Sequence, residues 1–216
     1  MVAYIGLHSK ARLGVSEDKT KLALSKDARL GAMRALAAVS LMPTSQLTSF
    51  EDKLGKLRSC SSLVESNLQT VVYCPHCGFN PKNEQATLLP AASALKELDE
   101  ELDSLLDGWK QALLNDLSDP FTEANFELLR PAARKLIKDF LASRTLPDPV
   151  TPEFVSAVQE ALAGLEKVLV AAEEIKTALL QGGSPATPDD LRKRFDNFLL
   201  DRCKGKDASK LRFVVD

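Results

Sequence analysis

The sequence predicts a mainly α-helical fold, a helical bundle with a small inserted knuckle and one or two short β-strands. The first observation is composition, because the 216 residues are 44% hydrophobic but only 6% aromatic, and Leu, Ala and Val dominate. That balance suits helices packed on helices better than a sheet-based core. The second is the three- and four-residue spacing of apolar residues along most of the chain. The third is a break in that spacing at residues 61–86, where turn formers surround two cysteines.

Helices are expected to fill the N-terminal part of the chain. Residues 2–40 are predicted to form two or three of them, the last with Asp27 as its N-cap and Pro43 closing the segment. A further helix is expected from about residue 48 or 49 to Cys60, with acidic residues in its first turn. Residues 70–73 are β-prone and predict a minimal strand that leads into the knuckle.

The clearest helix is predicted from Pro90 to about Leu117. Its apolar residues alternate by three and four positions, at Leu95, Leu98, Leu102, Leu105 and Trp109. This spacing resembles a coiled-coil seam, but the segment is too short for a free-standing coiled coil. We therefore expect a buried stripe inside a helical bundle.

Helices that begin at a proline are predicted in the C-terminal part of the chain. One starts at Pro131, and Thr151 followed by Pro152 then opens a long helix that is expected to end at Gly182 and Gly183. The predicted buried stripe of this long helix is Phe154, Val158, Leu162, Leu165, Leu169, Ala172 and Leu179.

The same capping device at Thr187-Pro188 predicts a basic helix to about Arg202. Residues 211–215 are expected to form a short strand, and Val71–Tyr73 could be its pairing partner. The proline-rich connector 146–152 is the best place for a boundary.

Two regions follow from that boundary. The first is a helical domain at 1–146 with its knuckle at 60–81. The second, at 151–216, contains the long helix, the basic helix and the C-terminal strand. The two regions could also pack as one domain.

The sequence Cys74-Pro-His-Cys77-Gly78 predicts that the knuckle binds zinc. Zinc prefers four soft or borderline ligands in a tetrahedron, and a Cys-x-x-Cys turn supplies two of them from one tight loop. Gly78 allows the backbone to turn away, and backbone N–H groups of such a turn can donate to the thiolates.

The other two ligands must come from elsewhere in the chain. Cys60 is the third predicted ligand, and Cys203 completes the predicted set. His8 and His76 stay open as alternatives for the fourth position. His76 is the weakest of these, because a ring inside a Cys-x-x-Cys loop normally points outward.

The same motif has two other uses in proteins. Cys-Pro-His-Cys is also the active-site sequence of strongly oxidising thioredoxin-fold enzymes, but that chemistry needs a helix starting at the first cysteine. Gly78, Asn80 and Pro81 disfavour such a helix. A zinc hook, in which loops from two chains share one metal, would make the protein a zinc-dependent dimer.

Charge and composition exclude several other classes. The net charge is −2, so no overall field points to nucleic acid or membrane. No apolar stretch approaches a membrane span, and no signal peptide is recognised, so we expect a cytoplasmic protein with reduced thiols. Phosphate-binding and dinucleotide-binding loops and a nucleophile elbow are missing from the sequence, and we therefore expect a protein that is not an enzyme.

A basic segment near the C-terminus offers a different function. Residues 192–212 contain eight Lys or Arg against three Asp or Glu. Such a patch could bind DNA or an acidic partner, although solvated helix faces are the commoner reason for local charge. The residues predicted for nucleic-acid binding are Arg192, Lys193, Arg194, Arg202, Lys204 and Lys206.

Dispersed motifs also resemble a known family. They are Leu7–Gly14, Leu41–Pro43 with Gln46-Leu47, Cys60, Cys74–Pro81, Gly183–Pro185 with Thr187-Pro188, Lys204–Asp207 and Lys210–Val214. Together they resemble the C-terminal region of large bacterial P-loop proteins of phage defence, the phage-growth-limitation and BREX ATPases of the PglY/BrxC kind. The resemblance implies a role in phage defence through assembly with other system components or DNA, with the ATPase elsewhere. It also favours Cys60, Cys74 and Cys77 as site residues.

We therefore predict a non-catalytic, zinc-stabilised helical interaction or assembly module, part of a phage-defence ATPase protein. Its expected partners are proteins of the defence system, and dimerisation is possible. A nucleic-acid-binding module is the first alternative, and a thiol-disulfide oxidoreductase is the second.

Overall fold

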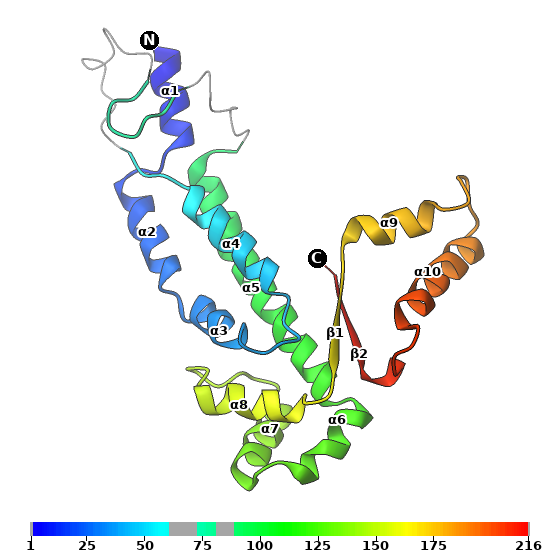
Figure 1. Cartoon of the computed structure of the whole chain (residues 1–216). Helices are drawn as coiled ribbons and strands as arrows, with labels where there is room; N and C mark the ends of the chain where they lie inside the picture. The colour runs from blue at the N-terminus through cyan, green and yellow to red at the C-terminus, as the bar shows by residue number, and fades with distance from the viewer. Residues whose placement is uncertain (1, 61–72, 81–88, 216) are drawn as a thin grey trace. The chain divides into compact units, whose positions relative to one another are not determined.

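The computed structural model describes residues 2–60, 73–80 and 89–215, and it is mainly helical with one small sheet (Figure 1). The predicted fold class is confirmed. The chain forms two compact units, Met1–Met33 with Leu47–Gly108, and Arg34–Gln46 with Trp109–Asp216. The connector 146–152 lies inside the second unit.

Three helices cover the N-terminal region, as the sequence predicts for residues 2–40. They are α1 (Val2–Ala11), α2 (Val15–Ser25) and α3 (Ala28–Leu36). Asp27 caps α3, because its Oδ1 accepts a 2.8 Å hydrogen bond from the Arg29 N–H.

The next helix, α4 (Thr44–Lys56), differs from its prediction at both ends. It begins earlier, directly after Pro43, and it ends before Cys60. The expected placement of Cys60 on a helix end is therefore wrong. The chain after Lys56 leaves the helix because its backbone pairs with the α1–α2 connection, where the Cys60 N–H donates to the Leu13 carbonyl at 3.0 Å.

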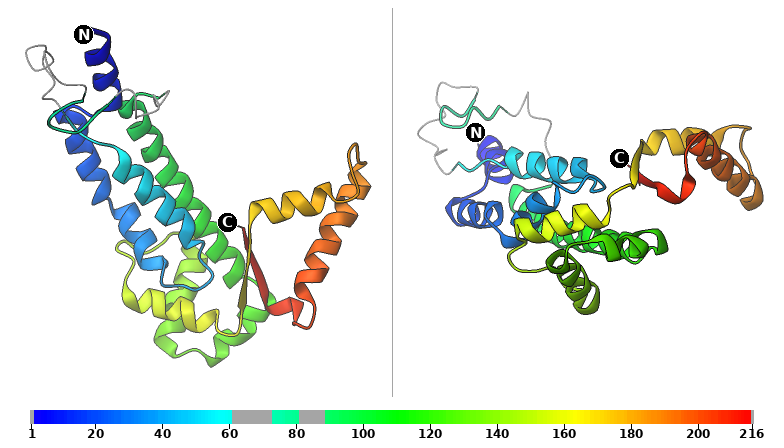
Figure 2. Two further views of the ribbon diagram at one scale, coloured as in Figure 1. Left: turned by 45° about the horizontal axis from the view of Figure 1, so that its top comes forward. Right: turned by 60° about the horizontal axis from the view of Figure 1, so that its bottom comes forward.

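The long helix α5 (Ala91–Leu117) confirms the clearest prediction. Leu95, Leu98, Leu102 and Trp109 are at most 5% exposed, as expected of a core stripe. In the first unit α4 runs beside α5, and Lys53 and Glu101 form an ion pair of 2.7 Å between them (Figure 2).

The second unit adds short helices and the sheet. Its further elements are α6 (Pro120–Asn125), the 3₁₀ turn η2 (Phe126–Leu128), α7 (Pro131–Ser143), α8 (Pro152–Ala161), β1 (Glu166–Val170), α9 (Ala172–Leu180), α10 (Pro188–Cys203), the 3₁₀ turn η3 (Ala208–Lys210) and β2 (Leu211–Val215). The helix predicted at Pro131 is present as α7. The basic helix is present as α10, with Thr187 and Asp190 forming a capping box.

The single long helix predicted after Thr151 is wrong. Thr151 does cap α8, accepting from the Phe154 N–H at 3.3 Å, but α8 ends at Ala161. Gly164 then adopts a left-handed φ of +91°, and the chain continues as β1 and α9. The predicted stripe therefore divides among a helix, a strand and a second helix, and Leu169 of β1 is 57% exposed.

The C-terminal strand is confirmed as β2, but its pairing differs from the expected one. β2 pairs in parallel with β1, with Glu166 opposite Leu211, so a segment predicted to be helical is its partner. A minimal strand was predicted at residues 70–73, with Val71–Tyr73 as a possible partner of the C-terminal strand. Residues 70–72 lie outside the described residues, and Tyr73 lies in a bend.

Candidate metal centre

Two polar side chains from the end of α1 and the residue after it are directed toward the cysteine segments. His8 lies in α1, and Arg12 directly follows the last helical residue, Ala11. The Arg12 N–H still donates to the His8 carbonyl at 3.0 Å, so the helical spacing continues to Arg12 and places both side chains on one side of the chain. Both are buried, with 3% of His8 and 7% of Arg12 exposed. Buried side chains of this kind need partners, and they find them in the cysteine segments.

Cys60 is positioned by backbone pairing. Leu13, just after α1, forms an isolated parallel β-bridge with Ser59. The Leu13 N–H donates to the Arg58 carbonyl at 2.8 Å, and the Cys60 N–H returns to the Leu13 carbonyl at 3.0 Å. This short bridge fixes the third cysteine next to the end of α1.

The Cys74–Cys77 turn is closed by its own backbone. The Gly78 N–H donates to the Cys74 carbonyl at 2.8 Å, and the Cys74 N–H donates to the Phe79 carbonyl at 2.8 Å. Gly78 has a φ of +70°, a left-handed conformation that favours glycine. The knuckle predicted from the sequence is therefore present as a compact turn with both thiols on it.

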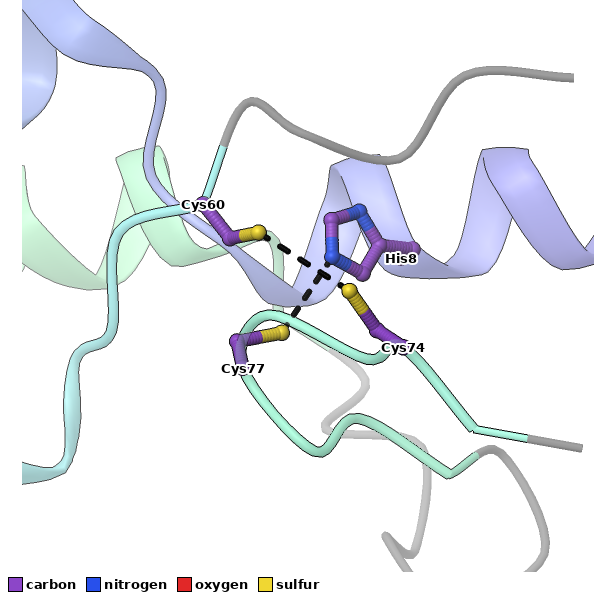
Figure 3. Close-up of side chains that lie close together, drawn as sticks. All are labelled: His8, Cys60, Cys74 and Cys77. Carbon is purple, nitrogen blue, oxygen red and sulfur yellow. Dashed lines mark hydrogen bonds between the residues drawn. The ribbon is translucent and has the colours of Figure 1, made fainter. Parts of the chain in front are cut away.

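Four potential ligand atoms converge from these three segments (Figure 3). The sulfurs of Cys60, Cys74 and Cys77 and a ring nitrogen of His8 all lie within 4.8 Å of one another. Cys60 Sγ and Cys74 Sγ are 3.9 Å apart, and Cys77 Sγ is 3.4 Å from His8 Nε2. Cys74 is fully buried, whereas Cys60 and Cys77 are half-buried. This group could hold a metal ion.

Phe79 and Arg12 surround the group. The Phe79 ring meets the His8 ring edge-on at 5.4 Å, and the Arg12 guanidinium lies 5.1 Å from the Phe79 ring centre. Arg12 Nε also donates to Cys77 Sγ at 3.4 Å. Burial would raise the pKa of the Cys77 thiol, but hydrogen bonds from Arg12, the Phe79 backbone and the neighbouring cysteines together lower this pKa below its ordinary value.

The structure brings together three of the four ligands predicted from the sequence, namely Cys60, Cys74 and Cys77. Cys203, the fourth of that set, is not in the group and is instead the last residue of α10, in the second unit. His8, one of the alternatives, takes the fourth position, and His76 is exposed on the turn. The sequence indicated His8 only as an alternative, because its position does not distinguish a ligand from an ordinary buried histidine.

The residues predicted for nucleic-acid binding are mostly engaged in contacts within the second unit. Arg202 pairs with Glu174 of α9 at 2.6 Å, and Lys206 pairs with Glu166 of β1 at 3.1 Å. Arg194 donates to the carbonyls of Leu179 and Gly183.

Two more of these residues pair along their own segment. Arg192 pairs with Asp189 and Lys204 with Asp201, while Lys193 is exposed on α10. These contacts are typical of side chains that stabilise a helical hairpin.

Residues 16–108 match the model of a family of unknown function, described as the sixth domain of that family (DUF6079). The matched range contains the three clustered cysteines, and His8 precedes it. Comparisons with curated proteins and with solved structures gave no significant match. Among the described residues, no helix combines the length and the apolar character needed to cross a membrane.

Proposed function

We propose that this chain is a non-catalytic, zinc-stabilised helical module for interaction or assembly. The observation that carries the proposal is the convergence of His8, Cys60, Cys74 and Cys77 from three separate segments. Three sulfurs and an imidazole nitrogen form one of the donor sets of structural zinc sites. Soft thiolates also disfavour magnesium or calcium, which take oxygen ligands.

Two of the separations between the donor atoms match a tetrahedron around zinc. With Zn–S near 2.3 Å and Zn–N near 2.0 Å, two sulfurs should lie about 3.8 Å apart and a sulfur and a nitrogen about 3.5 Å apart. The corresponding separations are 3.9 Å for Cys60 and Cys74, and 3.4 Å for Cys77 and His8. A disulfide would need sulfurs about 2.0 Å apart, so these separations suit shared ligation of a metal.

A full set of four protein ligands favours a structural role over a catalytic one. Catalytic zinc sites keep one coordination position for water or substrate, whereas structural sites fill all four with protein atoms. Zinc here would tie α1 to the segment after α4 and to the knuckle before α5. The free energy of zinc binding would then contribute directly to folding of this part of the chain.

We assign the module to a larger phage-defence ATPase protein, where it would assemble with protein partners of the defence system. Two observations support this assignment. The dispersed motifs of the chain resemble the C-terminal region of such proteins, and the matching family model is described as a sixth domain.

The same geometry favours the module over its alternatives. A shared zinc hook is not required, since one chain supplies four donors. The oxidoreductase alternative needs an accessible thiol at a helix N-terminus, but Cys74 is buried in a turn. Nucleic-acid binding through Arg202 and Lys206 would compete with the ion pairs that these two residues form.

Metal analysis combined with native mass spectrometry tests the proposal. We expect one zinc per chain in the purified protein, and none in a Cys74→Ser/Cys77→Ser double variant. Cys203→Ser is the matched control and should keep full zinc content. Purified protein with no zinc and no affinity for added zinc, or a double variant that keeps zinc, would contradict the proposal.

A pair of histidine variants identifies the fourth ligand. His8→Gln should weaken zinc binding by at least about tenfold, because it removes a ligand of the set. His76→Gln changes the exposed histidine of the Cys74–Cys77 turn, which is not one of the four clustered donors, and should leave the affinity unchanged. Competition with a chromogenic chelator measures both, and equal affinities for the two variants would remove His8 from the site.

A further inference from the structure

Arg12 is a buried cation next to the proposed metal centre. Only 7% of its surface is exposed, although arginine is rarely buried without a specific partner. Its Nε donates to Cys77 Sγ at 3.4 Å, and its Nη1 donates to the Ala11 carbonyl at 3.2 Å. The guanidinium also lies over the Phe79 ring, 5.1 Å from the ring centre.

The charge of the proposed centre explains why a cation belongs there. Three thiolates and a neutral imidazole around a divalent ion leave one net negative charge. Cys74 and His8 are almost completely buried, so water can screen this charge only in part. The nearest way to offset a partly buried negative charge is a cation that donates a hydrogen bond to one of the sulfurs.

We propose that Arg12 is the charge-balancing positioning residue of the metal centre, an inference that rests on the proposed zinc site. Its contact with Cys77 offsets the net charge of the three thiolates. Its guanidinium lies over the Phe79 ring, and this ring also contacts His8. These contacts hold the ligand histidine and the knuckle in their relative positions. Helix α1 thus supplies a ligand, and the first residue after the helix supplies the cation that balances the ligand set.

The shape of the arginine side chain matters as well as its charge. A guanidinium is a planar fork, so one edge can donate to a sulfur and to a carbonyl while the face stacks on an aromatic ring. Lysine would keep the positive charge but lose the fork and most of the stacking. Glutamine would keep an N–H donor but lose the charge.

Zinc affinities of three variants test the inference. Arg12→Gln should weaken zinc binding about 10- to 100-fold, as expected for loss of a group that supports metal ligands. Arg12→Lys should bind with intermediate affinity, because it restores the charge alone. Lys10→Gln removes the same charge from an exposed position of α1 and should leave the affinity unchanged.

Cobalt substitution gives a second readout that a purely structural role would not move. Loss of the hydrogen bond to Cys77 leaves more electron density on its sulfur. The thiolate-to-cobalt charge-transfer band of Arg12→Gln should therefore shift to lower energy, while the Lys10→Gln band stays in place. Circular dichroism of the zinc-loaded variants checks that the helices are intact.

The outcomes separate this inference from the function it rests on. If the unaltered protein binds no zinc, the proposed function and the inference both fail. If it binds zinc and Arg12→Gln binds equally well with an unshifted band, the inference alone fails. If Arg12→Gln binds more tightly than Arg12→Lys, hydrogen bonding and not charge is the contribution of Arg12, and the charge-balancing role is overturned.

Discussion

Helices α7 and α8 of the second unit bury large apolar side chains almost completely, among them Ile137, Phe140, Phe154 and Val158. The rings of Phe140 and Phe154 meet edge-on at 5.4 Å. Among the described residues of the first unit, the apolar cluster around the proposed metal donors is smaller. Its buried members are Cys74 and Phe79, and the partly buried residues packed against them are Ile5, Ala11, Cys60 and Cys77.

From this difference and the proposed zinc site, we expect the two regions to be stabilised by different forces. Burial of one large apolar side chain contributes about 1.5–3 kcal/mol, so the pair of helices α7 and α8 gains much of its stability from packing. The described residues around Phe79 include few large apolar side chains, so we expect the proposed zinc to contribute much of the order of these three chain segments. A structural zinc can contribute about 10–16 kcal/mol in a small domain, which is ample to order them.

Removal of the metal should give the largest loss of stability. We expect this loss only at the metal end of the first unit, which consists of the end of α1, the segment around Cys60 and the Cys74–Cys77 turn. After chelation we expect amide protection at Leu13, Cys60, Cys74 and Gly78 to fall about 100-fold or more, because zinc ligation stabilises the backbone bonds that these amides form. Hydrogen exchange followed by mass spectrometry measures this loss.

Amides of α7 and α8 are the internal control for chelation. Their protection depends on apolar packing, so it should change little when zinc is removed. Unchanged protection at the four amides of the metal end, in protein shown to contain no zinc, would show that the comparison between the two regions is mistaken.

Helix prediction succeeded where the signal is local. The apolar spacing in α5 and the Thr187–Asp190 capping box of α10 lie within a few residues of the structure that they determine. Strand β1 was missed because the spacing of Leu162, Leu165 and Leu169 is compatible with a helix. Its conformation depends on parallel pairing with β2, more than 40 residues away, and Gly164 was the one local warning.

In the candidate metal site, too, the local sequence identified some of the donors but not all of them. Cys74 and Cys77 could be found from their spacing, because both thiols lie on one turn. The choice between His8 and Cys203 could not be made from spacing, since it depends on which distant segment packs against the knuckle. His8 lies 66 residues before Cys74, and only the three-dimensional structure brings α1 beside this turn.

Loss of an aromatic side chain should destabilise the second unit without affecting zinc. Phe154→Ala removes a ring that is 1% exposed and packed on Phe140, and we expect it to lower the free energy of unfolding by about 3–5 kcal/mol. Chemical denaturation measures the loss, and metal analysis should still find one zinc per chain.

Phe195→Ala is the control for this change. It removes the same side chain from α10, where Phe195 is 36% exposed, so the loss should be clearly smaller. A loss of zinc in Phe154→Ala would mean that the two regions are not stabilised independently.

Ion pairs on the helices of the first unit should contribute least, and with a defined pH dependence. Arg29 pairs with Asp27 at 2.9 Å, and its hydrogen bonds lower the pKa of the Asp27 carboxyl below 3.8, the ordinary value. This contribution is therefore complete above pH 3.8 and is lost as the pH falls through the lower folded-state pKa. Asp27→Asn keeps an N-cap for α3 but removes the charge, and should cost less than about 1 kcal/mol at pH 7.

Urea unfolding of the metal-free proteins at a series of pH values measures this difference without interference from zinc release. The stability gap between the unaltered protein and Asp27→Asn should shrink toward zero as the pH falls below 3.8. Asp52→Asn, which removes an exposed carboxylate from α4, controls for the general change in charge. A stability gap between these two proteins that does not change with pH would mean that Asp27 acts only as the N-cap of α3. The ion pair with Arg29 would then contribute nothing to the stability of the first unit.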